Sequence, residues 1–402
     1  MRRIGRLADV ARRGRRYGYM SLPALIALRK QDLRFDPGRR HHGRMPSPNT
    51  PVSAPPVPAS ATRRWDEMLR SLAALLPAGS ASVLIDGGGE QPAVLATRLA
   101  AALAASGRVC ARVSDGGGGS RGDAGEETVR LADGPAWRAA GELDAACSWD
   151  VVIWVHTPPT GGTPGGPAAS PGGQADEHGA DIVIDMYDPD WPVIRRVAAP
   201  LAARGPWYLT ETRAFFSCRA ATWNTRFGDD MPAYAAAVAR AGIRRGGVAI
   251  DVGCGTGRAL PALRQAVGPD GAVIAADLTP EMLDQARLVS AAAGAALVLA
   301  DARRLPFADA SADALFAAGL VNHLPDPEAG LGELARVTRP SGLLVLFHPS
   351  GRAALAARHG RTLSPDEPLA ADPLGRSTVA AGWRLTAYDD AVDHFFALAV
   401  RE

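Results

Sequence analysis

The amino-acid sequence predicts an α/β fold with two doubly wound domains that follow a disordered N-terminal leader. Short apolar runs, the pattern of buried parallel strands, recur from residue 81 to the end of the chain. Two of these runs, at 81–86 and 248–251, lead directly into a glycine-rich turn and then the start of a helical pattern. A proline-rich stretch at 46–60 separates the first of them from a strongly basic start.

Residues 1–60 are predicted to be the disordered leader. Residues 1–44 carry thirteen Arg or Lys against three acids, and Arg-rich segments of this kind can bind nucleic acid or anionic membrane. Residues 46–60 consist largely of Pro, Ser and Ala, so they bury too little apolar surface to fold. Translation from Met20 or Met45 is an alternative explanation of the leader.

The composition narrows the class of protein. The net charge of +2 gives no general affinity for nucleic acid, and no apolar run approaches the ~20 residues that cross a membrane. The four cysteines have neither metal-site nor disulfide spacing; they are Cys110, Cys147, Cys218 and Cys254. We therefore expect a cytoplasmic protein with no metal, no nucleic-acid partner and no membrane partner.

Residues 61–205 are predicted to form the first α/β domain. Its buried strands are expected at 81–86, 150–155 and 181–185. Three features resemble the P-loop uridine kinases: the strand that ends in the Asp86-Gly87 turn, Leu131–Trp137, and Ala180–Pro189. The resemblance implies a nucleoside-kinase-like fold for this domain.

The phosphate-binding chemistry of that family is missing. A P-loop, G-x-x-x-x-G-K-[ST], needs a lysine on the phosphates and a hydroxyl on Mg²⁺. Counted from Gly87, the last three positions are Pro92, Ala93 and Val94, and the only lysine of the chain is Lys30 in the leader. We therefore expect a degenerate domain without kinase activity. The functions that remain for this domain are structural support, formation of a homodimer, or binding of an unphosphorylated ligand. An active kinase is the less favoured alternative.

Residues 206–402 are predicted to form the second domain, and its first strand carries the most informative turn. The strand ends in Asp251, and Gly253, Gly255 and Gly257 follow. The glycines allow a close approach of the backbone to a ligand. The pattern differs from G-x-G-x-x-G, because Arg258 stands where that fingerprint needs Gly or Ala. An acid before the turn repels phosphate and suits a cationic, amino-bearing ligand such as S-adenosylmethionine (SAM).

Further strands of this domain also end in acids. Runs at 271–277 and 295–301 end in Asp277 and Asp301, and two more strands are expected at 314–323 and 342–347. A carboxylate at the end of the second strand can accept both ribose hydroxyls. Thr279 is expected to cap the following helix, with Pro280 at its first position.

This half of the chain, from about Thr210 to Glu402, resembles the class I SAM-dependent methyltransferases of the small-molecule type, related to those of quinone biosynthesis. The motifs that carry the resemblance are Asp251–Gly257, Asp277 with Thr279–Leu283, Asp301–Phe307, Arg336–Gly342, and the pair Trp383–Tyr388 and Phe395–Val400. It implies a seven-stranded Rossmann-like domain that an antiparallel hairpin completes. The cofactor would be SAM, and the partner a small-molecule methyl acceptor.

The resemblance also assigns the cofactor residues. Asp251, Gly253, Cys254, Gly255 and Gly257 would face the methionine part of SAM, and Asp277 the ribose. Leu278 and Met282 would flank adenine, Asp301 and Ala302 would bind its edge, and Trp223 would cover the cofactor from a helical lid at 219–230. Core packing is the alternative for the apolar members of this set.

The acceptor side is less clearly marked. Asn322 and His323 follow the fourth strand, at the edge where open α/β sheets bind ligands. A neutral His323 could take a proton from an acceptor hydroxyl or amine. His348, Arg352, His359 and Arg361 could line the pocket of an anionic acceptor, and a solvated helix face explains them equally well. A SAM-binding scaffold without methyl transfer is the alternative function.

Overall fold

The structure is a computed structural model that describes residues 58–112, 128–134, 149–157, 179–227, 229–358 and 363–402. The leader as far as residue 57, Cys147, His359 and Arg361 lie outside the described residues. The chain divides into two compact units, of which one ends at Phe215 and the other begins at Phe216. The predicted α/β class is confirmed in both units, because each is built on a largely parallel sheet.

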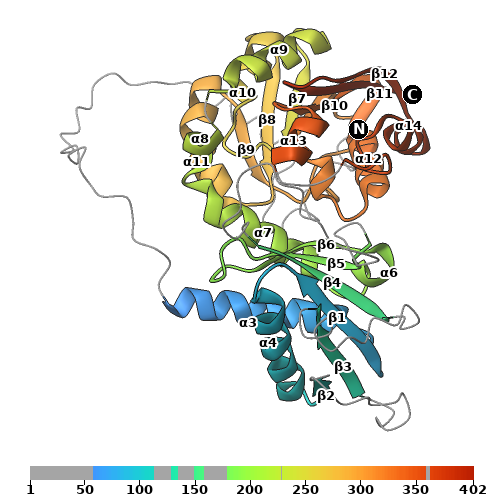
Figure 1. The fold of residues 1–402 in the computed structure, drawn as a ribbon. Helices are drawn as coiled ribbons and strands as arrows, with labels where there is room; N and C mark the ends of the chain where they lie inside the picture. The colour runs from blue at the N-terminus through green and yellow to red at the C-terminus, as the bar shows by residue number, and fades with distance from the viewer. Residues whose placement is uncertain (1–57, 113–127, 135–148, 158–178, 228, 359–362) are drawn as a thin grey trace, which may run out of the picture. The chain divides into compact units, whose positions relative to one another are not determined.

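The sheet of the N-terminal unit has six strands in the order β2-β3-β1-β4-β5-β6 (Figure 1). Their bounds are β1 Ala81–Gly87, β2 Val109–Arg112, β3 Thr128–Asp133, β4 Val151–His156, β5 Ile182–Asp185 and β6 Val193–Val197. All neighbours are parallel except β6, which runs antiparallel to β5. The helices are α3 (Pro58–Leu75), α4 (Gln91–Ala105), α6 (Ala199–Ala202) and α7 (Trp207–Ala220), the last of which contains the division between the units. The strands predicted from the sequence are β1, β4 and β5.

The turn after β1 lies where the chain reverses direction across the sheet. The chain leaves β1 for the β2–β3 side and later returns to β4 on the other side, which makes this the switch point where open sheets bind ligands. Gly87 closes β1 so tightly that a Cβ there would lie 2.3 Å from the carbonyl oxygen of Val155. This contact makes Gly87 obligatory.

A buried ion pair joins two helices of the same unit. Arg64 of α3 donates to Glu211 of α7 at 2.6 Å, and both side chains are buried to 1% exposure or less. Glu211 also accepts a hydrogen bond from the backbone N–H of Ile194 at 3.0 Å. Burial raises the pKa of Glu211, and the Arg64 charge opposes this shift. The pair therefore ties α3, α7 and β6 together.

The sheet of the C-terminal unit has seven strands in the order β12-β13-β11-β10-β7-β8-β9 (Figure 1). Their bounds are β7 Val248–Val252, β8 Ala272–Asp277, β9 Ala296–Leu299, β10 Ala312–Ala318, β11 Thr338–His348, β12 Trp383–Asp390 and β13 Phe395–Arg401. Only β13 is antiparallel to its neighbours. This is the doubly wound order, in which the chain reverses direction at β7, and it confirms the predicted Rossmann-like sheet with its final hairpin.

Helices cover both faces of this sheet. They are α8 Trp223–Phe227, α9 Met231–Ala241, α10 Leu260–Val267, α11 Pro280–Ala293, α12 Pro327–Val337, α13 Arg352–Arg358 and α14 Ala371–Ala380. The helices α9, α10 and α11 pack together on one face, and α12 packs with α14 on the other. The largest apolar cluster, with Leu315, Leu344 and Trp383, lies between the sheet and the second group.

Two local features differ from the sequence prediction. Strand β10 ends at Ala318, because Gly319 takes a positive φ of 67° that a strand does not contain; Asn322 and His323 therefore lie in a short 3₁₀ turn, Val321–His323. Thr279 does precede α11, yet its side chain makes no capping hydrogen bond.

Candidate functional site

The three glycines after β7 are all in the left-handed region, with φ of 72° at Gly253, 52° at Gly255 and 86° at Gly257. A Cβ at Gly257 would lie 2.9 Å from Leu260 Cδ1, and one at Gly253 would lie 3.2 Å from Leu320 Cδ1. At Gly255, no atom of the described residues other than its chain neighbours lies within 4 Å of the Cβ position. The turn therefore leaves open space beside Gly255, where a ligand can reach the backbone.

Asp277, at the end of the neighbouring strand β8, holds this turn. Its carboxylate accepts hydrogen bonds from the backbone N–H groups of Gly255 and Thr279, each at 2.8 Å. The carbonyl of Ala276 accepts from the N–H groups of Gly253 and Cys254 at 2.8 and 3.0 Å. The sheet order thus brings Asp277 and the glycine turn together, although 22 residues separate Gly255 from Asp277.

The two acids of this edge are buried together. Asp251 is 2% and Asp277 is 8% exposed. Burial first, and then the nearby charge of Asp277, raises the pKa of Asp251 to about 8. Burial also raises the pKa of Asp277, against the hydrogen bonds that it accepts. A cation placed beside these carboxyls would favour their ionised forms. Open space at a glycine backbone that donates to Asp277, with a second buried acid near Asp277, fits the sulfonium and ammonium groups of SAM.

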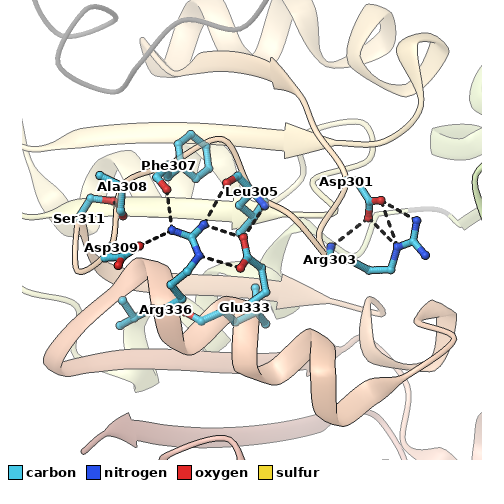
Figure 2. A network of polar contacts seen from close by, with 11 residues as sticks. Asp301, Arg303, Leu305, Phe307, Ala308, Asp309, Ser311, Glu333 and Arg336 are labelled. Atoms are coloured by element: carbon cyan, nitrogen blue, oxygen red, sulfur yellow. Dashed lines mark hydrogen bonds and ion pairs between the residues drawn. The ribbon is translucent and has the colours of Figure 1, made fainter. Parts of the chain in front are cut away.

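The residues predicted to surround adenine follow β8 and β9. Met282 is buried, Leu278 is half-buried and Ala302 is buried. Asp301 accepts hydrogen bonds from the backbone N–H and the guanidinium of Arg303, the closest at 2.8 Å (Figure 2). Arg303 was missed from the sequence, although its position two residues after Asp301 was a usable signal.

Two side chains of α12 hold the segment that follows Asp301. Arg336 donates to the carboxylates of Glu333 and Asp309 and to the carbonyls of Leu305 and Phe307 (Figure 2). Glu333 in turn accepts the N–H of Leu305 at 2.6 Å. These contacts position the loop that carries Asp301 and Ala302.

The helix α8 is joined to the glycine turn by polar contacts. Asn224 Oδ1 accepts a hydrogen bond from Thr256 Oγ1 at 2.7 Å and a longer one from Arg258 Nε at 3.3 Å. Arg258, 8% exposed, also forms an ion pair with Asp230. The sequence showed Arg258 only as a departure from the dinucleotide fingerprint. A charged residue at a position that normally holds Gly or Ala could have indicated that its side chain makes specific polar contacts. Trp223 of α8 is half-buried, with its ring 5.8 Å from that of Phe216.

The acceptor-side residues are divided among several environments. Asn322 is exposed, and the ring of the partly buried His323 lies edge-on to Phe216 at 5.1 Å. His348 ends β11 beside Gly319. Arg352 pairs with Glu367 at 3.1 Å and with Asp390 at 3.5 Å, so its charge is already compensated.

Comparisons with known proteins address the C-terminal unit. A family model described as "Methyltransferase domain" matches residues 250–346. A 37.1 kDa protein in transposon TN4556 of Streptomyces fradiae is 41% identical over 107 residues, which are 26% of this chain and 31% of that protein. A demethylmenaquinone methyltransferase of Staphylococcus aureus (strain JH9) is 38% identical over 129 residues, 32% of this chain and 49% of that enzyme. The chain thus spans half or less of the length of these curated relatives.

Among solved structures, a SAM-dependent methyltransferase from Aquifex aeolicus is similar at 25% identity and a TM-score of 0.36, over 43% of this chain and 90% of that one. In the described parts of the chain, no helix is long and apolar enough to cross a membrane. The same residues contain no cluster of side chains suited to a metal ion.

Proposed function

Because residues 250–346 lie in a class I SAM-dependent methyltransferase domain, we propose that this protein transfers a methyl group from SAM to a small-molecule acceptor. The observation that carries the proposal is the open space beside Gly255, whose backbone N–H donates to the buried carboxylate of Asp277. When bound, SAM supplies a methyl group that its sulfonium already activates. The protein must then align the acceptor and exclude water, and such positioning can lower a barrier by ~7–11 kcal/mol.

Each cofactor residue has a proposed contact. Asp251 and the turn from Gly253 to Gly257, which includes Cys254, bind the methionine part, and Asp277 binds the ribose hydroxyls. Leu278 and Met282 flank the adenine, Asp301 and Ala302 bind its edge, and Trp223 with Asn322 closes the site from the acceptor side. The support is their location: all but Trp223 lie at or shortly after the carboxyl ends of four neighbouring strands, β9, β8, β7 and β10.

His323 is the candidate that the sequence offers for removing a proton from the acceptor. It lies in the turn after β10, next to the switch point of the sheet. Its edge-on contact with Phe216 fixes the plane of its ring. Its replacement by Ala tests the role: a general base contributes about 10²–10⁴-fold to the rate.

The N-terminal unit is proposed to be a kinase-like domain that binds no phosphate. Pro92 lies in the first turn of α4, so it contributes no N–H donor next to the Gly87 turn. Ala93 and Val94 follow in the same helix and provide neither a cation nor a hydroxyl. We assign this unit structural support or the binding of an unphosphorylated ligand.

The proposed function is tested with the full chain freed of cofactor. Calorimetry should detect binding of SAM, and Gly255→Arg, which fills the open space, should abolish it. Incubation with methyl-labelled SAM and a deproteinised metabolite extract should then label a small molecule. SAM binding without any labelled product would favour the alternative of a SAM-binding scaffold, and loss of both would refute the cofactor assignment.

A further inference from the structure

A second histidine lies at the carboxyl edge of the sheet, one strand away from His323. His348 is the last residue of β11, and the neighbouring strand β10 has just ended at Ala318. Gly319 donates its N–H to the carbonyl of Phe347 at 2.9 Å, which places it directly beside His348. Apart from the chain neighbours of Gly319, the atom of the described residues that lies within 4 Å of its Cβ position is Cδ2 of His348, at 3.8 Å. The Cδ2 atom of the imidazole therefore lies beside the end of β10.

The other side of the ring is held by the chain itself. His348 Nδ1 lies 2.9 Å from the carbonyl oxygen of Ser350, and the backbone N–H of Ser350 donates toward the same nitrogen at 3.1 Å. The tautomer with a proton on Nδ1 donates to the carbonyl and has a lone pair on Nε2; this is the tautomer that a base acting through Nε2 needs. Among the described residues, Nε2 has no hydrogen-bond partner.

The charge of this histidine is set by its surroundings. Burial lowers the pKa of His348, and the nearby charge of Arg358 lowers it further, while the Ser350 carbonyl and Asp230 act in the opposite direction. Because the ordinary pKa of histidine is already near 6.5, His348 is neutral at pH 7. A neutral imidazole with a lone pair on Nε2 accepts a proton.

The end of β10 connects His348 to the cofactor turn. Leu320 follows Gly319, and its Cδ1 atom lies 3.2 Å from the Cβ position of Gly253. Gly319 thus lies beside the imidazole, and the next residue, Leu320, lies beside the glycine turn. An acceptor bound at this dipeptide would be close to both.

We propose that His348, in place of the sequence candidate His323, is the general base of the reaction and that it takes the proton from the atom of the acceptor that is methylated. The proposal rests on the proposed methyl transfer. The hydroxyl or N–H of the acceptor gives its proton to Nε2 of His348, and the lone pair of that oxygen or nitrogen bonds to the methyl carbon. The carbon–sulfur bond breaks with its electron pair left on sulfur, S-adenosylhomocysteine departs, and the imidazolium returns its proton to water.

The same surroundings indicate the class of acceptor. His348 is neutral, and the guanidinium of Arg352 is shared between Glu367 and Asp390. These two residues therefore offer no free positive charge to an acceptor, and a proton that passes to His348 must come from a hydroxyl or an amine N–H of the acceptor.

The first test needs no acceptor. Nitrogen-15 NMR of the full chain labelled at histidine should show His348, assigned by the loss of its signals in His348→Gln, as a neutral ring with the proton on Nδ1 at pH 7. A proton on Nε2, or a ring that is charged at pH 7, would overturn the proposal.

The second test uses methyl-labelled SAM and the extract fraction that takes up the label from the wild-type chain. His348→Gln should lower the rate by about 10²–10⁴-fold, more than His323→Ala, with an unchanged Kd for SAM, and free imidazole should restore part of the rate to His348→Ala. His394→Gln is the matched control, because His394 pairs with Asp389 and Asp393 at the β12–β13 connection; it should behave as wild type. If wild type labels a product and His348→Gln does so equally fast, His348 is not the base. If the wild-type chain labels no product, the proposed methyl transfer is refuted, and the role of His348 falls with it.

Discussion

The residue that most constrains the chemistry is Asp251. Its carboxyl is 2% exposed and has a pKa of about 8, so at neutral pH it is mostly protonated before a ligand binds. A cation that binds beside it must lower that pKa. Proton release and cofactor binding are therefore linked at this one side chain.

The linkage predicts how affinity depends on pH. Below pH 8 the bound cation must expel a proton from Asp251, so the Kd for SAM should fall by up to about tenfold per unit as the pH rises from 6 to 8. Calorimetry in two buffers with different ionisation enthalpies measures the proton released. Asp251→Asn is the control, and its binding enthalpy should not depend on the buffer. Equal dependence in both proteins would contradict the assignment.

The same pKa predicts a change in stability. The folded chain binds this proton more tightly than the unfolded chain, whose Asp has the ordinary value near 3.8, so Asp251 destabilises the fold as the pH rises from about 4 to 8. Asp251→Asn without ligand should therefore gain stability relative to wild type between pH 5 and pH 8. Thermal unfolding of both proteins at the two pH values measures the difference. A stability difference between variant and wild type that is the same at pH 5 and pH 8 would contradict the raised pKa of Asp251.

Sequence alone was sufficient for some residues of the site and insufficient for others. Asp251, the glycines and Asp277 could be predicted because each lies within a few residues of an apolar strand, so strand and site residue are visible in one short stretch of sequence. The Asn224 and Arg258 contacts could not, since they join residues 34 positions apart. The environment of His348 also depends on where Gly319 ends the neighbouring strand.

At the scale of elements, contacts between helices and turns decide what is rigid. Asn224 joins α8 to the glycine turn through Thr256 and Arg258. Removal of these hydrogen bonds loosens the turn that the cofactor needs. At roughly 0.5–1.5 kcal/mol for a hydrogen bond, Asn224→Ala should weaken SAM binding by about 3–10-fold in calorimetry. Thr222→Ala, which removes only a surface contact with the Arg219 carbonyl, should leave the Kd for SAM unchanged. An equal loss of affinity in both variants would mean that the Asn224 hydrogen bonds have no specific effect on SAM binding.

The Arg64–Glu211 pair makes a prediction for α3 and α7. Arg64→Ala leaves a buried carboxylate without its partner, which costs about 3–5 kcal/mol. Glu67, the other partner of Arg64, is 38% exposed, so Glu67→Ala should cost at most about 1 kcal/mol. Hydrogen exchange of the α3 and α7 peptides reports both changes. Protection that is equal in the two variants would mean that the buried pair does not hold α3.

At the scale of the whole molecule, the sequence predicted two α/β units because each has its own strand, glycine turn and helix. It could not predict the short strands β2 and β6, since β2 is largely exposed and β6 contains two consecutive arginines, and neither has the apolar pattern of a buried strand.

The two units should respond to different nucleotides. SAM at about 100 times its Kd should stabilise the unit that binds it by ~2.7 kcal/mol, whereas ATP with Mg²⁺ should move no unfolding transition, because the Gly87 turn lacks the lysine and hydroxyl of a P-loop. Differential scanning calorimetry of the full chain tests both. Stabilisation by Mg·ATP that Gly88→Asp removes would mean that the N-terminal unit is a nucleotide-binding domain after all.

The three glycines of the turn are required for different reasons. A side chain at Gly257 would meet Leu260 of α10, and one at Gly253 would meet Leu320 after β10. Beside Gly255, no atom of the described residues other than its chain neighbours lies within 4 Å of the Cβ position. A side chain at 257 must disturb the fold, whereas one at 255 meets only the cost of its backbone angle, about 1–2 kcal/mol. In a library of variants scored separately for cellular abundance and for methylation, variants at position 257 would lose both abundance and methylation. Variants at position 255 would remain abundant and lose only methylation. Selection for folding alone would therefore not preserve Gly255.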